Sequence, residues 1–295
     1  MGELLEHVHA GASSARWLPG WGVLQFAAMA AAFAWFVKRT PGDLARLRVC
    51  LLIGFAGAAL GAAAFGVAIR VPAWVRSGFE IRALARGGIM AYGALAGLSI
   101  AFTIMARRRG FDIGSSLDRL APIMGLLVLF ARVGCFFGGC EFGVVTSSPL
   151  GVRFPPQSPA FRQHLEAGLI LASDRGSLAV HPAQLYEAAS GILMIAVALL
   201  IERKSNIKNT QYPQGSPAPG AAFAGAVATY ALCRFFVEFA RGDALRGHLG
   251  PLSTGQWLSL IALAGAVAFL ARSPPSTSFR PSPGGPHLQQ RKPVE

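Results

Sequence analysis

Long apolar stretches recur along the chain and are separated by shorter polar segments. Each is long enough to approach or cross the roughly 30 Å hydrocarbon core of a bilayer. The pattern predicts seven membrane-spanning helices, over residues 21–37, 49–69, 88–106, 120–138, 183–201, 220–240 and 255–271. The fold class that this pattern predicts is an all-α integral membrane protein.

The composition supports this interpretation. Of 295 residues, 53% are hydrophobic and 14% are charged, and the mean hydropathy is +0.47. These values are too apolar for an ordinary water-soluble domain of this length. Glycines such as Gly57 and Gly61 lie inside the predicted spans, where small residues let helix backbones approach closely.

The net charge of +13 must be read against membrane topology before it is taken as a sign of nucleic-acid binding. Alternate loops, including the C-terminal tail, are richer in Lys and Arg than the others and hold all the lysines, which are Lys38, Lys204, Lys208 and Lys292. The positive-inside rule therefore predicts a cytoplasmic C-terminus and an outer N-terminus, and we expect no nucleic-acid partner.

The chain is expected to form one membrane domain over residues 1–272, with a retained first helix and a disordered basic tail over residues 273–295 that is rich in Pro and Ser. Between the fourth and fifth predicted helices lies a long, proline-containing segment over residues 140–180. Loops of this length in compact proteins are often functional, so we expect a periplasmic functional region here.

The stretch "ARVGCFFGGCEFG", residues 131–143, places Arg132 near the end of the fourth predicted helix, followed by Cys135 and Cys140. The cysteine spacing differs from the C-x-x-C of common redox motifs, and two cysteines with one histidine are too few to predict a metal site. A membrane thiol oxidoreductase is therefore a less favoured hypothesis. A structural disulfide between Cys135 and Cys140 stays open, because an outer location is oxidising.

The stretch "HPAQLYE", residues 181–187, is typical of a helix start. Pro182 suits the first helical position, and Gln184 stands where a capping-box side chain reaches back. His181, Gln184 and Glu187 are expected to share one face near a helix N-terminus, which favours an anion. Alternatively, these residues cap the helix and anchor Tyr186 at the membrane interface.

In "YALCRFFVEFARGD", residues 230–243, Arg234, Glu238 and Arg241 form a stripe along one helix face. Charges within a membrane span usually pair with each other or line a substrate path. We expect Arg234 to pair with Glu238, which leaves Arg241 as a free guanidinium suited to a phosphate.

The stretch "RGGIMAYGALAGL", residues 86–98, opens the third predicted helix with closely spaced glycines that can admit a lipid or another helix. Its polar aromatic residue, Tyr92, fits either of two roles. It can be an interfacial tyrosine or a hydrogen-bonding group in a cavity.

Together these stretches resemble the prolipoprotein diacylglyceryl transferase family. "HPAQLYE" is close to the family's H-P-S-Q-L-Y-E, "RFFVEFARGD" follows R-F-x-x-E-F-x-R, "GGIMAYGALAGL" follows G-G-x-x-F-x-G-G, and "GQWLSL" matches the start of the last helix. The resemblance implies a seven-helix enzyme of the bacterial inner membrane, with an active site reached from the membrane and the periplasm. Its members move the diacylglyceryl group of phosphatidylglycerol to the lipobox cysteine of a prolipoprotein.

The resemblance also implies roles for individual residues. Arg132 matches the essential arginine of the signature G-R-I-G-N-F-I-N-G-E-x-W-G, and Arg241 matches a second essential arginine. Both are expected to hold the phosphate.

Other site residues are also expected from the resemblance. His181 is a plausible base, and Tyr92 stands where the family often has a histidine. The expected substrate-binding residues are Gly134, Cys135, Gly139, Gly143, Gln184, Glu187, Arg234 and Glu238. The expected partners are phosphatidylglycerol, the prolipoprotein signal peptide and the bilayer, and no cofactor or metal is implied.

The chain departs from the family pattern at several polar positions. The two asparagines of the signature are Cys135 and Gly138 here, its glutamate is Cys140, and a tyrosine of the first helix is Gln25. A second hypothesis is therefore a lipid-binding or lipoprotein-binding relative without turnover.

Overall fold

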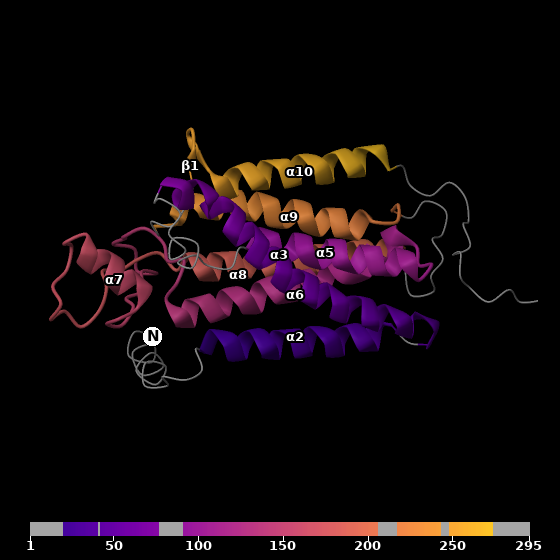
Figure 1. The fold of residues 1–295 in the computed structure, drawn as a ribbon, viewed down its shortest axis with the longest axis horizontal. Coiled ribbons are helices and arrows are strands. Elements are labelled where there is room, and N and C mark those ends of the chain that lie inside the picture. The colour runs from indigo at the N-terminus through magenta and orange to yellow at the C-terminus, as the bar shows by residue number, and fades with distance from the viewer. Residues whose placement is uncertain (1–19, 41, 77–90, 206–216, 243–247, 274–295) are drawn as a thin grey trace, which may run out of the picture.

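The computed structural model describes residues 20–40, 42–76, 91–205, 217–242 and 248–273, which form a bundle of long helices with a smaller segment at one end (Figure 1). Each predicted span coincides with one long helix, so the all-α fold class is confirmed. These helices are α2 (Gly20–Arg39), α3 (Arg46–Arg76), α5 (Ala91–Arg108), α6 (Ile113–Gly138), α8 (Ala183–Ser205), α9 (Ala221–Val237) and α10 (Thr254–Arg272). The shorter elements are η1 (Gly42–Ala45), α7 (Pro159–Glu166), η3 (Glu238–Ala240) and the antiparallel strands β1 (His248–Leu249) and β2 (Leu252–Ser253).

Within the described residues, 5 helices are long and apolar enough to cross a membrane: α3, α6, α8, α9 together with η3, and α10. The helices α2 and α5 fall outside that set. The multi-pass character of the chain is therefore established, whereas the count of seven spans and their direction stay predictions. The predicted disordered tail lies almost entirely outside the described residues.

The fourth predicted span begins too late. Helix α6 begins at Ile113 rather than at residue 120, because the Asp112 side chain accepts a hydrogen bond from the Ser115 backbone amide at 2.8 Å and caps the helix. Arg119, which the sequence placed in a loop, is therefore buried within the helix.

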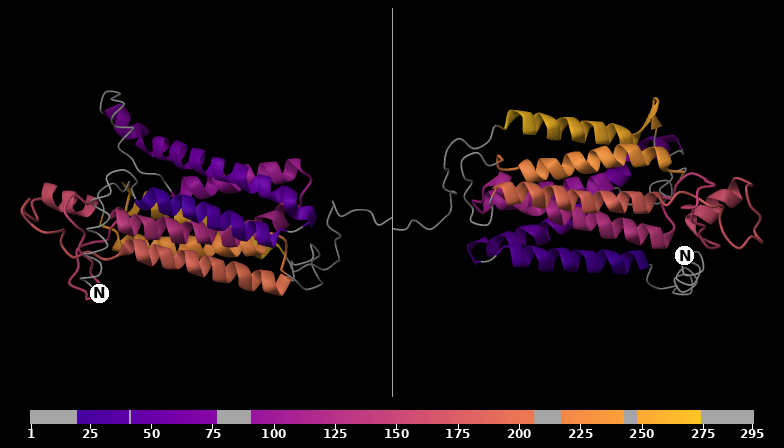
Figure 2. Two further views of the ribbon diagram at one scale, coloured as in Figure 1. Left: turned by 90° about the horizontal axis from the view of Figure 1, so that it is seen from below. Right: turned by 180° about the vertical axis from the view of Figure 1, so that it is seen from behind.

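Helix α6 lies at the centre of the bundle. It packs against α2, α5, α8 and α9, while α3 pairs with α5 and α10 packs on the outside of α9 (Figures 1 and 2). The main apolar core lies between these helices and includes Phe36, Leu98, Phe102, Ile123 and Met194. A residue on α6 therefore meets more neighbouring helices than a residue on the outer helices does.

Glycines bring α6 and α8 into backbone contact. A Cβ added at Gly125 would lie 2.7 Å from the Gly191 carbonyl oxygen, and one added at Gly191 would lie 2.6 Å from the Gly125 oxygen. The predicted close approach of Gly57 and Gly61 is likewise confirmed, since both glycines contact α5 through backbone atoms. The α6 to α8 contact matters most for the site, which is built about two turns farther along α6.

Polar contacts join neighbouring helices at the end of the bundle far from α7. The Asp118 carboxylate accepts backbone hydrogen bonds from Gly220 at 2.8 Å and from Phe223 at 2.9 Å, so a side chain of α6 caps the start of α9. At the same end, Arg39 and Glu202 form an ion pair between α2 and α8.

The segment over residues 139–182 lies beyond the ends of the long helices, where Figure 1 shows α7 projecting from the bundle. A small core of Phe136, Phe142, Phe154, Ala160 and Val180 holds it together. Ser158 caps α7, and its hydroxyl accepts a hydrogen bond from the Phe161 amide at 3.1 Å. The predicted functional loop is thus an ordered structure that packs on the end of α6.

Candidate active site

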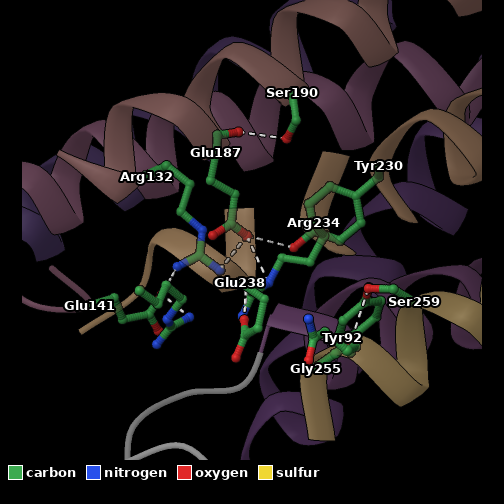
Figure 3. Close-up of polar contacts among 12 residues, drawn as sticks. Tyr92, Arg132, Glu141, Glu187, Ser190, Tyr230, Arg234, Glu238, Gly255 and Ser259 are labelled. Carbon is green, nitrogen blue, oxygen red and sulfur yellow. Dashed lines mark hydrogen bonds and ion pairs between the residues drawn. The ribbon is translucent and has the colours of Figure 1, made fainter. Parts of the chain in front are cut away.

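The Glu187 carboxylate lies between α6, α8 and α9 and binds three groups with one oxygen. Its Oε1 lies 2.8 Å from Arg132 Nη2 and 3.5 Å from Arg234 Nε, and it accepts a hydrogen bond from the Tyr230 hydroxyl at 2.8 Å (Figure 3). The Ser190 hydroxyl donates to the Glu187 carbonyl at 2.6 Å, one turn farther along α8. One carboxylate therefore joins two arginines from different helices.

Further ion pairs extend from this centre. The second guanidinium nitrogen of Arg132, Nη1, contacts Glu141 Oε2, which also lies 3.3 Å from Arg241 Nη1. Arg234 pairs with Glu238 four residues later. We call this set the ion-pair cluster; its members are Arg132, Arg234, Arg241, Glu141, Glu187 and Glu238.

Among the described residues, the ion-pair cluster has equal numbers of positive and negative side chains and is largely buried. It contains three arginines and three carboxylates, and the exposed fractions of the side chains are 6% for Arg132, 8% for Arg241 and 2% for Glu187. Glu141 differs, because 30% of its side chain is exposed. Buried charges in a membrane bundle are costly unless they are paired, so this arrangement is a candidate functional site.

Backbone contacts place Arg241 beside the end of α6. Arg241 forms an isolated antiparallel bridge with Gly143, the Val144 amide donates to the Ala240 carbonyl at 2.9 Å, and the Gly242 amide donates to the Phe142 carbonyl at 3.0 Å. A Cβ at Gly143 would lie 2.7 Å from the Ala240 oxygen, so the approach requires glycine. Gly143, expected to bind substrate, thus leaves room here for His181 and for the Ala240 carbonyl next to Arg241.

The turn after α6 brings Gln184 to the same region. Gly139 ends the helix with φ 64, and Gly134 is buried in the preceding turn. Gln184 Nε2 donates to the Cys140 carbonyl at 2.7 Å. The expected capping box is therefore wrong: the His181 amide, which Gln184 would have reached, already donates to the Val144 carbonyl at 3.0 Å.

The disulfide between Cys135 and Cys140, which the sequence left open, is not formed. The Cys140 thiol instead donates to the Cys135 carbonyl at 3.6 Å. Hydrogen bonding with Cys135 and burial raise the pKa of the Cys140 thiol, which disfavours the thiolate that redox chemistry needs. Among the described residues, no group of three or more His, Cys, Asp or Glu side chains could hold a metal ion.

The expectation of a free Arg241 guanidinium is also wrong. Arg241 is buried and contacts Glu141, which lies on the segment that packs against its backbone. The expected pair of Arg234 and Glu238 is present, but Arg234 also contacts Glu187. Arg234 therefore belongs to the centre of the ion-pair cluster, whereas the sequence pattern had indicated only its pairing with Glu238.

The two other expected catalytic residues lie at the edges. The hydroxyl of Tyr92 lies 2.5 Å from Ser259 Oγ, and its ring meets the Tyr230 ring at a centroid distance of 5.6 Å. Because the Ser259 hydroxyl donates to the Gly255 carbonyl at 2.8 Å, it accepts from Tyr92. The His181 ring nitrogen Nδ1 lies 3.1 Å from the Tyr186 hydroxyl, so the hydrogen bond of this ring is local.

Three residues of the site were missed from the sequence: Glu141, Tyr230 and Ser259. A signal existed for two of them. Tyr230 precedes Arg234 by four residues and so shares its helix face, and Glu141 follows Cys140, which stands at the glutamate position of the signature. Nothing in the sequence pattern pointed to the contact between Ser259 and Tyr92.

Comparison with known proteins places these residues in a family context. Residues 12–272 match the family model of prolipoprotein diacylglyceryl transferase. This chain belongs to that family. The matched region contains the whole ion-pair cluster.

Similar proteins carry the name phosphatidylglycerol–prolipoprotein diacylglyceryl transferase. The protein of Clostridium tetani is 27% identical over 214 residues, which are 72% of this chain and 74% of the relative. The protein of Xanthomonas oryzae pv. oryzae (strain PXO99A) is 34% identical over 209 residues, 68% of this chain and 67% of the relative. The protein of Rhizobium leguminosarum bv. trifolii is 32% identical over 192 residues, 64% of this chain and 58% of the relative.

Proposed function

We propose that this chain transfers the diacylglyceryl group of phosphatidylglycerol to a cysteine thiol of a prolipoprotein and releases glycerol phosphate. In this reaction a carbon–sulfur bond forms, the bond between the glyceryl carbon and a phosphate oxygen breaks, and the thiol loses its proton. Membership of the family and the names of the relatives support the reaction. The acceptor cysteine is expected to lie in a lipobox.

One observation carries the proposal at the level of the site: Arg132 and Arg241, from distant parts of the sequence, contact the same carboxylate oxygen of Glu141. Two guanidinium groups that converge on one oxygen offer what a phosphate group needs, which is charge-assisted donors in fixed directions. As the glycerol phosphate leaves, its charge grows, and these donors would stabilise that growth.

The remaining groups support this pair. Glu187 orients Arg132 and Arg234, and Tyr230 fixes the Glu187 carboxylate, so the guanidinium of Arg132 has a set direction before the lipid binds. Tyr92, packed against Tyr230, would form part of the wall along the acyl chains. His181 stays a candidate base for the thiol proton.

We further propose that the protein lies in the bacterial inner membrane with its site on the periplasmic side. The site lies at the bundle end that carries α7, whereas Lys38 and Lys204 lie in or near the last turns of α2 and α8 at the opposite end (Figure 1). A lysine-rich end is expected in the cytoplasm.

A direct test uses cells depleted of their own transferase that express this chain. We expect a model prolipoprotein to gain the mass of one diacylglyceryl group, measured by mass spectrometry of the intact protein. The Arg132→Ala variant serves as the matched control, and the prolipoprotein should gain no mass in cells that express it. Correctly inserted wild-type protein that gives no mass gain would instead favour the lipid-binding relative without turnover.

A further inference from the structure

Glu141 differs from the other carboxylates of the ion-pair cluster in its exposure and in its contacts. Its Oε2 contacts Nη1 of both Arg132 and Arg241, whereas Glu187 and Glu238 are buried deeper in the bundle. With 30% of its side chain exposed, Glu141 is the carboxylate that water can reach. It therefore lies on the outer side of the two guanidinium groups.

The backbone at Glu141 is held in a conformation that glutamate rarely adopts. Its φ is 53, in the left-handed region. The carbonyl of the preceding residue, Cys140, is held by Gln184, and Gly143 just after it is bridged to Arg241. Such strain persists where surrounding contacts fix the chain, and it commonly occurs at ligand sites.

Charge balance indicates what must happen when an anion arrives. The cluster has three positive and three negative groups, so a phosphodiester would leave it with an excess negative charge in a poorly solvated place. Among the described residues, the side chains of Glu187 and Glu238 are almost fully buried and held in ion pairs. Glu141 can leave at lower cost, because its carboxylate can be hydrated at the surface.

We propose that the Glu141 carboxylate occupies the phosphate position between Arg132 and Arg241 in the empty protein, and that the phosphate group of the incoming lipid displaces it. The inference rests on the proposed function, in which the donor is a phospholipid. The carboxylate keeps two like-charged guanidinium groups together until the donor binds, and it competes with every phosphate that enters.

The experiment measures the dissociation constant of glycerol phosphate by calorimetry on the full chain in detergent, with inorganic phosphate titrated in parallel. The variants are Glu141→Gln and Glu141→Asn, and Asn is included because it tolerates the left-handed region. The matched control is Glu166→Gln, which removes the same charge from an exposed position on α7.

We expect both Glu141 variants to bind either phosphate about tenfold more tightly than wild type, because the site no longer has to open first. The control should bind like wild type, which separates competition at the site from net charge. In transfer assays the Glu141→Gln variant should show a lower KM for phosphatidylglycerol without a higher kcat. Equal or weaker binding by the variants, or no binding by any protein, would overturn the inference.

The two proposals fail in different ways. If the wild type transfers the diacylglyceryl group but the Glu141 variants do not bind phosphate more tightly, the proposed function stands and the displacement of Glu141 is refuted. Tighter binding without any wild-type transfer would support the displacement of Glu141 and count against the transferase function.

Discussion

Arg132 near the end of α6 and Glu187 near the start of α8 form a buried ion pair, with Arg132 Nη2 2.8 Å from Glu187 Oε1. The backbones of their helices touch at Gly125 and Gly191, which holds the two side chains at this separation. Because Glu187 also contacts Arg234 and Tyr230, the pair links three helices and sets the direction of the guanidinium that faces Glu141.

Replacing Glu187 with Gln should destabilise the protein and abolish transfer. The change leaves Arg132 and Arg234 without their shared carboxylate in a buried place, and we expect the free energy of unfolding to fall by about 3 kcal/mol. Thermal unfolding in detergent measures this, with Glu166→Gln as the control. An unfolding midpoint equal to that of the control would show that the shared carboxylate is dispensable.

Replacing Arg132 with Lys should impair transfer although the charge is kept. An ammonium group is a single point charge, so it cannot contact Glu187 and Glu141 through two separate nitrogens. We expect kcat/KM for phosphatidylglycerol to fall by at least about tenfold, or 1.4 kcal/mol. The control is Arg162→Lys at an exposed position on α7, which should leave kcat/KM unchanged. A wild-type kcat/KM in Arg132→Lys would show that transfer does not need both guanidinium contacts.

Adding one methyl group at Gly125 should disturb the site from a distance. Its Cβ would lie 2.7 Å from the Gly191 oxygen and 3.0 Å from the Ile195 amide nitrogen, both of them backbone atoms, so α6 and α8 must separate. The control is Gly265→Ala on α10, where a Cβ meets nothing within 4 Å.

We expect Gly125→Ala to lower both the unfolding midpoint and kcat. Gly265→Ala should be neutral or stabilising, by up to about 1 kcal/mol, because Ala favours helix over Gly. If both variants behaved alike, the helix contact would not be what positions Arg132.

The segment over residues 139–182 should lose stability in mild acid through His164. Burial lowers the pKa of His164, and its Nδ1 accepts a hydrogen bond from the Leu178 amide at 3.2 Å, so the folded state favours the neutral ring. The unfolded state, with a pKa near about 6.5, then binds more protons. The stabilisation from the neutral His164 ring is therefore fully present above the pKa of the unfolded state. It is lost as the pH falls from that value toward the lower pKa of the folded state.

This can be measured by limited proteolysis of the segment between pH 7.5 and 5. His164→Asn keeps an acceptor but does not titrate, so its protection should depend less on pH. A variant whose acid response matched that of wild type would assign the effect to another group.

Replacing both Cys135 and Cys140 with Ser should leave transfer close to the wild-type rate. Neither thiol is part of a disulfide, and the hydrogen bond from the Cys140 thiol to the Cys135 carbonyl can be made by a hydroxyl. Transfer assays on the double variant, with thiol titration of the wild type, test this. A large loss of transfer together with an oxidised wild-type pair would revive a redox role for these cysteines.

The sequence was informative about the helices and about which polar residues matter. Long apolar stretches predicted the long helices of the described residues, with boundary errors where capping residues such as Asp112 extend a helix into polar sequence. Charges within apolar spans identified Arg132, Arg234 and Glu238. Such residues stand out because an unpaired charge in hydrocarbon is too costly to be incidental.

The partners of these charges could not be predicted, because they come from segments far apart in the chain. Arg241 was expected to be free, yet it meets Glu141, which is separated from it by 100 positions. Gln184 was expected to accept a hydrogen bond from the His181 amide and so cap its own helix. The His181 amide instead donates to the Val144 carbonyl, and the Gln184 side chain donates to the Cys140 carbonyl.

Residue order alone was enough to show that this chain forms apolar helices, that charged residues interrupt them, and that its motifs follow those of one family. All three follow from local properties, namely hydropathy, helix capping and residue order. Packing of the helices was needed to show that Glu187 joins two arginines and that Glu141 lies between Arg132 and Arg241. Those contacts depend on glycines that bring backbones together, and side-chain pairing across such an approach is a property of the packed bundle.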